Sequence, residues 1–138
     1  YWTPFADWFG WSRGIEGSSY NYSDTWLKAN GMDRKNCGAK CMDPTHPGTI
    51  ERMRYFVNKF KSMGFRYIKL DFMTNGAVEA DYFYDRYITT GTQAYNYGMQ
   101  KFMEICGEDM FLVLSISPVF PSQYAHARRI SCDAWGET

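Results

Sequence analysis

The segment Tyr67–Phe72 limits the possible folds of this chain most strongly. Successive side chains of a β-strand point to opposite faces, so Lys69 and Asp71 share one face while Ile68 and Leu70 share the other. The apolar face is expected to pack against helices. The charged face predicts the mouth of a parallel barrel, where polar residues at the carboxyl ends of strands line a site. An antiparallel strand with one solvated face is the alternative.

Helical and strand-like segments alternate along most of the chain. Apolar residues recur every three or four positions from Ile50 to Met63, which predicts a helix, and a second helix is predicted from about Thr92 to Cys106. Strands are predicted at residues 1–5, 65–72, 111–117 and 129–133, and residues 74–91 are predicted to form a loop that contains a short helix. This alternation predicts βαβ units and a parallel sheet.

The segment from Ala6 to Pro44 shows no sustained period. It is rich in Gly, Ser, Asn and Asp and holds three tryptophans, so we predict a long loop. Long loops inside a compact domain are usually functional, and those at the carboxyl ends of barrel strands build binding sites.

Composition bounds the domain count and the partners. The chain has 138 residues, 45% of them hydrophobic, which is enough for one domain with its own core. The net charge is zero and the basic residues are scattered, so we expect no nucleic-acid partner and no binding to an acidic membrane surface.

The longest apolar run, Phe111 to Leu114, is far too short to cross a bilayer. Because the chain starts at Tyr1 and not at a methionine, we expect it to be part of a longer protein.

The cysteines and aromatic residues carry weaker signals. Cys37 and Cys41 lie close in sequence, but with only two histidines in the chain they are a poor zinc signal, and free or loosely paired thiols are expected. Aromatic residues make up 19% of the chain. Their faces are common platforms for sugar rings, although packing in the core explains most of them.

Each of the three later strands ends in polar side chains on one face. These are Lys69 and Asp71, then Ser115 and Ser117, then Arg129, Ser131 and Asp133. Parallel strands with polar carboxyl ends are expected to form part of a binding or catalytic site, and we expect the carboxyl groups of Asp71 and Asp133 to lie close together there. Paired carboxylates are what glycoside cleavage requires. Because a close cation favours the ionised form, the hypothesis is that Asp71 stays ionised beside Lys69 and Asp133 carries the proton.

Five motifs, in order and at matching spacing, resemble one known family. They are Trp2–Phe5, Met42–Pro47, Gly64–Phe72, Glu108–Pro118 and Arg129–Asp133. The chain resembles the α-galactosidase-like enzymes of glycoside hydrolase clan D, most closely family 36 and more distantly family 27. The resemblance implies an α/β fold, with residues 1–138 as the central part of one (β/α)8 TIM barrel, about strands three to six, and no second domain. The remaining barrel segments would come from the same protein.

The resemblance also implies a role for each matched residue. Asp71 falls on the nucleophile and Asp133 on the general acid/base of a retaining α-glycosidase, with no metal or cofactor. Lys69 and Arg129 fall on residues that hold substrate hydroxyls and the catalytic carboxylates. Trp2 falls on an aromatic wall of the sugar site, with simple packing as the alternative. The substrate would be an oligosaccharide or glycoside, and from that class alone a periplasmic or extracellular enzyme is expected.

Several alternatives remain open. Ser117 stands near a position where galactosidases carry Glu and α-N-acetylgalactosaminidases carry Ser, so a small residue there would leave space for an acetamido group. Lys69 would serve as the Schiff-base lysine of an aldolase, although Asp71 beside it argues for a charged and poorly nucleophilic amine. A barrel fragment that only binds carbohydrate is the third possibility, and plain ion pairs would explain Lys69 with Asp71 and Arg129 with Asp133.

Overall fold

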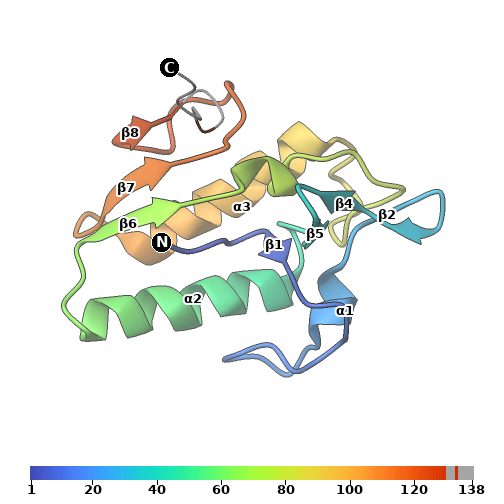
Figure 1. Ribbon diagram of the computed structural model, residues 1–138, viewed down its shortest axis with the longest axis horizontal. Coiled ribbons are helices and arrows are strands. Elements are labelled where there is room, and N and C mark those ends of the chain that lie inside the picture. Colours follow the sequence, from blue (N-terminus) through green and yellow to red (C-terminus); the bar gives the residue numbers. More distant parts are fainter. Residues whose placement is uncertain (130–132, 134–138) are drawn as a thin grey trace, which may run out of the picture.

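One of the two three-stranded sheets in the described chain is parallel, and its strands follow the order of the sequence (Figure 1). A computed structural model describes residues 1–129 and residue 133. The sheet consists of β6 (Tyr67–Leu70), β7 (Phe111–Leu114) and β8 (Ala127–Arg128) in that order. On the other side of β6, Trp2 forms a single parallel bridge to Leu70. The predicted first strand is thus reduced to one paired residue.

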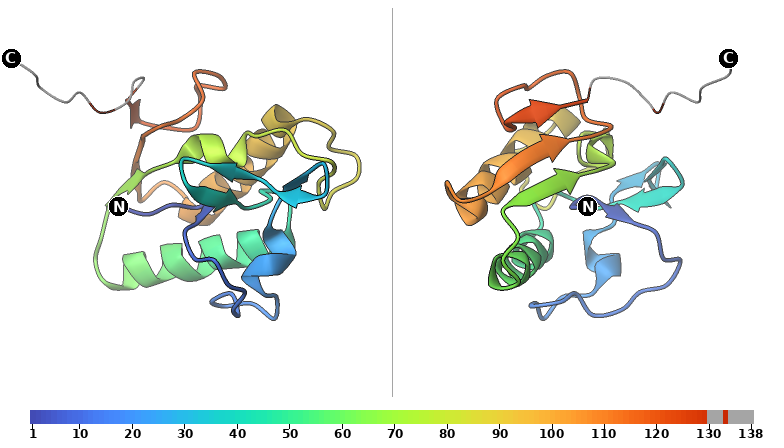
Figure 2. Two further views of the ribbon diagram at one scale, coloured as in Figure 1. Left: turned by 45° about the vertical axis from the view of Figure 1, so that its right-hand side comes forward. Right: turned by 60° about the vertical axis from the view of Figure 1, so that its left-hand side comes forward.

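Two long helices cover one face of this sheet (Figures 1 and 2). They are α2 (Pro47–Ser62) and α3 (Gly91–Cys106), close to the predicted ranges. The even-numbered strand residues face these helices and are buried, with a shared core of Ile68, Leu70, Leu112, Leu114, Met53, Val57, Met99 and Phe102. Burial of these side chains is the main source of stability for the layer pair.

The odd-numbered side chains lie on the opposite face of the sheet, which no helix of the described chain covers. The rings of Tyr67 and Phe111 stack there with centroids 5.7 Å apart, and His126 stacks on Phe111 at 4.8 Å. The predicted separation of the two faces is therefore confirmed for β6. In the described residues the strands form three small sheets and not a closed barrel.

The prediction of a long unstructured loop at residues 6–44 is wrong. This segment holds the short helix α1 (Tyr22–Thr25) and two small antiparallel sheets. The first sheet consists of β1 (Ala6–Asp7), β5 (Ala39–Cys41) and β4 (Lys35–Asn36), in that order. The second consists of β2 (Lys28–Ala29) and β3 (Met32–Asp33). Strands of two or three residues show no readable period. The turns between these strands are easier to recognise in the sequence than the strands themselves. Asn30-Gly31 and Cys37-Gly38 form two-residue hairpin turns, and all four residues have the positive φ angles that such turns require.

Other predicted boundaries also change. A 3₁₀ helix, η1 (Met73–Gly76), directly follows Asp71 and Phe72, and residues 77–90 contain no helix. The predicted strand at residues 129–133 starts earlier, because β8 ends at Arg128, and residues 130–132 lie outside the described residues. No helix among the described residues is long and apolar enough to cross a membrane.

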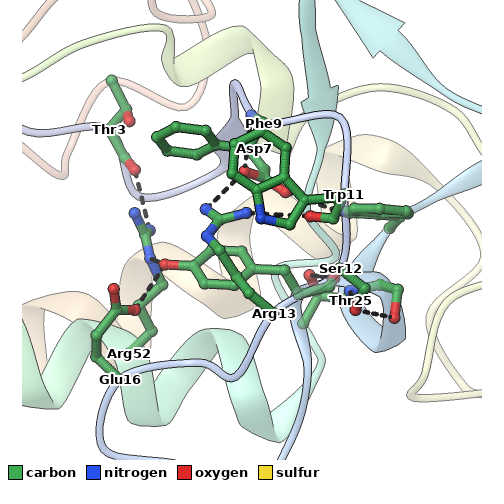
Figure 3. A network of polar contacts seen from close by, with 12 residues as sticks. Thr3, Asp7, Phe9, Trp11, Ser12, Arg13, Glu16, Thr25 and Arg52 are labelled. Carbon is green, nitrogen blue, oxygen red and sulfur yellow. Dashed lines mark hydrogen bonds and ion pairs between the residues drawn. The ribbon is translucent and has the colours of Figure 1, made fainter.

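A buried arginine joins the N-terminal segment to α2 (Figure 3). Arg52 donates through Nη1 to the main-chain oxygens of Thr3 (3.1 Å) and Pro4 (3.2 Å), and through Nε to the Tyr22 hydroxyl (2.9 Å). Its guanidinium also lies 4.7 Å from the centre of the Trp2 ring. These contacts hold the segment that bridges to β6 against the helix layer.

Replacing Arg52 by methionine should therefore destabilise the fold. The buried Pro4 carbonyl, the partly buried Thr3 carbonyl and the Tyr22 hydroxyl lose their donor, and we expect the free energy of unfolding to fall by about 2–3 kcal/mol in chemical denaturation. Arg54→Met is the matched control, because Arg54 lies exposed on the same helix and makes no hydrogen bond to a described residue. Equal losses in the two variants would contradict the role given to Arg52.

The N-terminus of α2 depends on a neutral histidine. His46 is the N-cap residue, and its Nδ1 accepts a hydrogen bond from the Gly48 amide at 3.0 Å. Burial lowers the pKa of His46 below its ordinary value, against the opposing influence of the Asp43 carboxylate. A protonated Nδ1 would lose the cap, since it has no lone pair to accept with.

This cap should make stability depend on pH. The unfolded chain binds a proton at His46 more readily than the folded chain, so the free energy of unfolding should fall as pH drops below about 6.5. His46→Asn keeps a capping side chain that does not titrate, and we expect a flatter profile between about pH 7 and pH 5. Denaturation at several pH values measures this, and parallel profiles for the two proteins would overturn it.

Candidate active site

Asp71 stands at the carboxyl end of β6, where the chain leaves the sheet. Its amide donates to the Trp2 carbonyl at 2.9 Å, its Oδ1 accepts from the Phe72 amide at 2.9 Å, and its Oδ2 lies 3.5 Å from Lys69 Nζ. Asp71 is 8% exposed as a residue, whereas the Lys69 side chain is 40% exposed. The fold therefore holds a nearly buried carboxylate beside a cation that reaches solvent.

Both central strands end in an unusual backbone conformation. Phe72 after β6 and Ile116 after β7 have φ angles of 53° and 45°, in the left-handed region that side chains other than glycine rarely adopt. The two turns are bonded to each other, because the Thr74 amide donates to the Ile116 carbonyl at 2.9 Å. Such strained residues cost on the order of 1–3 kcal/mol each and cluster at functional sites.

Two serine hydroxyl groups near the end of β7 have no hydrogen-bond partner among the described residues. Ser115 and Ser117 follow β7, and the Oγ atom of each is buried without a hydrogen bond to any described residue. Buried polar groups are nearly always bonded, so each exception needs a reason, and a site that takes a polar ligand is one such reason. The two serines follow β7, which pairs with the strand that carries Asp71, as the predicted polar ends of neighbouring strands require.

An unpartnered Ser115 hydroxyl should contribute nothing to the stability of the unliganded protein. We expect Ser115→Ala to leave the free energy of unfolding unchanged or to raise it, because the hydroxyl is desolvated without compensation. Thr25→Val is the control: the buried Thr25 hydroxyl donates to the Tyr22 carbonyl at 2.7 Å, and its loss should cost about 1 kcal/mol. A loss in Ser115→Ala as large as in the control would show that Ser115 has a partner.

A hairpin from the N-terminal third of the chain braces the segment after Asp71. Asn36 of β4 donates through Nδ2 to Thr74 Oγ1 (3.0 Å) and Asn75 Oδ1 (3.1 Å), and Asn75 donates back to the Asn36 carbonyl (3.1 Å). The exposed Trp8 ring meets Phe72 edge to face at 4.8 Å. Sequence analysis assigned no role to Asn36 or Trp8, and only the Cys37-Gly38 turn could have indicated the hairpin.

Arg129 and Asp133 form a separate pair. The Arg129 amide donates to the Leu114 carbonyl at 2.9 Å, which places Arg129 beside the end of β7, and its guanidinium binds Asp133 Oδ1. The Asp133 side chain is 60% exposed. Among the described residues, no hydrogen bond or ion pair joins this pair to Lys69 or Asp71.

Trp2 lies on the helix side of the sheet. It is 9% exposed, and its ring packs against Phe56, Phe60 and Phe102 with centroid distances of 5.3, 6.1 and 6.3 Å. The expected place in a sugar-site wall would require the opposite face. This position favours the packing alternative for Trp2.

Three of the four cysteines lie among the residues that the structure describes. Cys37, Cys41 and Cys106 are free, and burial raises the pKa of the Cys41 and Cys106 thiols to about 12. In the part of the chain that the structure describes, no group of three or more His, Cys, Asp or Glu residues is arranged to hold a metal ion.

Solved structures of one enzyme are similar to this arrangement. An α-galactosidase from Thermus thermophilus, in complex with p-nitrophenyl α-D-galactopyranoside, matches 94% of this chain with a TM-score of 0.71 and 23% identity. The same enzyme in complex with stachyose matches 78% with a TM-score of 0.60 and 25% identity. The chain is similar in fold to part of an α-galactosidase.

The similarity has clear bounds. The chain spans about a quarter of the α-galactosidase chains that it matches, 26% in one case and 24% in the other. No protein-family model and no curated protein sequence matches it. The fold of an α-galactosidase-like glycoside hydrolase domain is thus supported by structure, whereas the choice between families 36 and 27 stays a prediction.

Proposed function

We propose that the chain belongs to a retaining α-glycoside hydrolase, most specifically an α-galactosidase. The observation that carries this proposal is the nearly buried Asp71, paired with Lys69 at the carboxyl end of a parallel strand. A carboxylate held there by a cation and a main-chain amide has the position and charge of a nucleophile. The fold similarity to an α-galactosidase supports the sugar class.

In the proposed mechanism Asp71 attacks the anomeric carbon while Asp133 protonates the departing oxygen. Asp133 then takes a proton from water, which attacks the glycosyl-enzyme and restores both carboxyl groups. Lys69 and Arg129 orient the two carboxylates through their ion pairs and donate to substrate hydroxyls. The free Ser117 hydroxyl is proposed as a further substrate contact.

We further propose that the sheet is part of a (β/α)8 barrel. Within the parallel sheet the order of pairing, from Trp2 through β6 and β7 to β8, follows the order in the sequence, as it does for consecutive barrel strands. A doubly wound sheet would reverse its order at a switch point. The uncovered face with Tyr67 and Phe111 would then be the barrel interior, and other segments of the same protein would supply the remaining strands.

Asp71→Asn tests the proposed nucleophile. In the intact protein we expect the turnover of an aryl α-galactoside to fall by at least about 10³-fold while the thermal unfolding profile is kept. Asp33→Asn is the matched control, since Asp33 is also ion-paired, with Lys28 and Lys40, but lies in β3. Full activity of Asp71→Asn would refute the assignment, and the absence of α-glycosidase activity in the wild type would favour a barrel that only binds carbohydrate.

Covalent trapping separates the proposal from its alternatives. A 2-fluoro galactosyl fluoride should label Asp71 as an ester detectable by peptide mass spectrometry, because a retaining enzyme forms a glycosyl-enzyme. Borohydride reduction with a carbonyl substrate would instead label Lys69 if the protein were an aldolase. Faster turnover of an N-acetylgalactosaminide than of the galactoside would assign Ser117 to an acetamido-binding position.

A further inference from the structure

The helix α1, the strand β2 and the loop at residues 77–90 lie at one end of the molecule (Figure 1). Residues of these three segments, together with Asp43 and His46, line a cavity there. Its volume is about 340 Å³, within the range of small-ligand sites. The loop is fixed to the β2–β3 hairpin, because the Asp81 carboxylate accepts from the Asn30 (2.8 Å) and Gly31 (2.9 Å) amides. None of the residues that line this cavity contacts Asp71 or Lys69 through a hydrogen bond or ion pair.

A buried histidine gives this cavity a free donor. His46 is 5% exposed and lines the cavity, with its ring held edge to face between Tyr20 and Tyr84 at 4.8 Å from each. Since Nδ1 accepts from the Gly48 amide, the proton of the neutral ring lies on Nε2. No described residue accepts from Nε2.

Two further polar groups of the cavity also favour a ligand that accepts hydrogen bonds. The Asp43 carboxylate is already occupied, since Oδ1 accepts from the Thr45 amide and hydroxyl and Oδ2 from the Tyr84 amide at 2.7 Å. Arg86 lies over the Tyr82 ring at 4.0 Å and forms no ion pair with a described carboxylate. The exposed Asp24 carboxylate also lines the cavity, and only its Oδ2 accepts from a described residue, the Asn21 amide at 2.8 Å. The polar groups facing a ligand therefore offer two donors, His46 Nε2 and the Arg86 guanidinium, and one acceptor, Asp24, which suits a ligand whose hydroxyl groups both accept and donate.

Aromatic rings complete the lining. Tyr82 and Tyr84 lie on the loop and line the cavity together with Trp26. Each of the two tyrosines is 54% exposed, so neither is part of the buried core. Rings with an apolar face and a polar tip suit the C–H face of a sugar, whose hydroxyl oxygens accept hydrogen bonds at its edge.

We propose that this cavity is a saccharide-binding site separate from the candidate active site. One sugar unit packs against Tyr82 and Tyr84 while its hydroxyl oxygens accept from His46 Nε2 and the Arg86 guanidinium. The site binds without cleaving, because the buried Asp43 carboxylate already accepts from three donors and is not available as an acid or a nucleophile.

The two histidines of the chain make a direct test possible. Stachyose and D-galactose, as separate probes, are titrated into ¹⁵N-labelled Asp71→Asn protein, and the imidazole resonances of His46 and His126 are followed by NMR. We expect a saturable shift of the His46 Nε2 resonance with at least one probe and none at His126, which lies on the open face of the sheet. The Asp71→Asn background keeps the probes intact, and the outcome is independent of whether Asp71 is a nucleophile.

Variants then locate the binding surface. Tyr82→Ala should weaken binding by about tenfold, the effect of losing one stacked ring. Arg86→Ala should weaken it as well, and Tyr87→Ala is the matched control, because Tyr87 is exposed on the same loop but does not line this cavity. The absence of a His46 shift at saturating probe, or equal affinities of Tyr82→Ala and Tyr87→Ala in proteins with unchanged thermal unfolding, would overturn the proposal.

Discussion

Burial of alternate residues in β6 and β7 is the constraint on which the rest of the structure depends. Leu70 and Leu114 are paired in register and buried against α2 and α3. Because successive side chains of a strand alternate between faces, the odd-numbered side chains must lie on the opposite face of the sheet. Lys69 owes its position to this parity, and the same alternation brings it beside Asp71. A slip of one residue in β6 would place the lysine in the apolar layer, where its charge would be costly.

The candidate site is stabilised from two directions. On the sheet side, the bonded turns after β6 and β7 hold Phe72 and Ile116 in left-handed conformations. On the loop side, the β4–β5 hairpin binds Asn75 through reciprocal amide hydrogen bonds. Rigid support of this kind keeps the Asp71 carboxylate in one orientation, as the nucleophile role that we propose would require. The N-terminal third of the chain is therefore part of the site and not only a connection.

Much of the fold was readable from sequence, and the failures have physical causes. The helices were predicted because apolar stripes span four turns and glycine follows each stripe at Gly64 and Gly107, and the parity of Ile68 and Leu70 identified the buried face of β6. The small sheets were missed because strands of two residues carry no period. The side of the sheet on which Trp2 packs depends on Arg52 and the phenylalanines of α2, which are distant in sequence. The cavity around His46 was unreadable because three separate segments form it.

The order of the strands has a consequence for how the protein is made. In the parallel sheet Trp2 pairs with β6, β6 with β7 and β7 with β8, so each strand of this sheet pairs with the segment of the same sheet that was synthesised before it. In the sequence, α2 lies between Trp2 and β6, and α3 lies between β6 and β7, so each of these pairings comes with its own covering helix. The sheet can therefore extend one βα unit at a time as the polypeptide emerges from the ribosome, with one growing edge exposed at each stage.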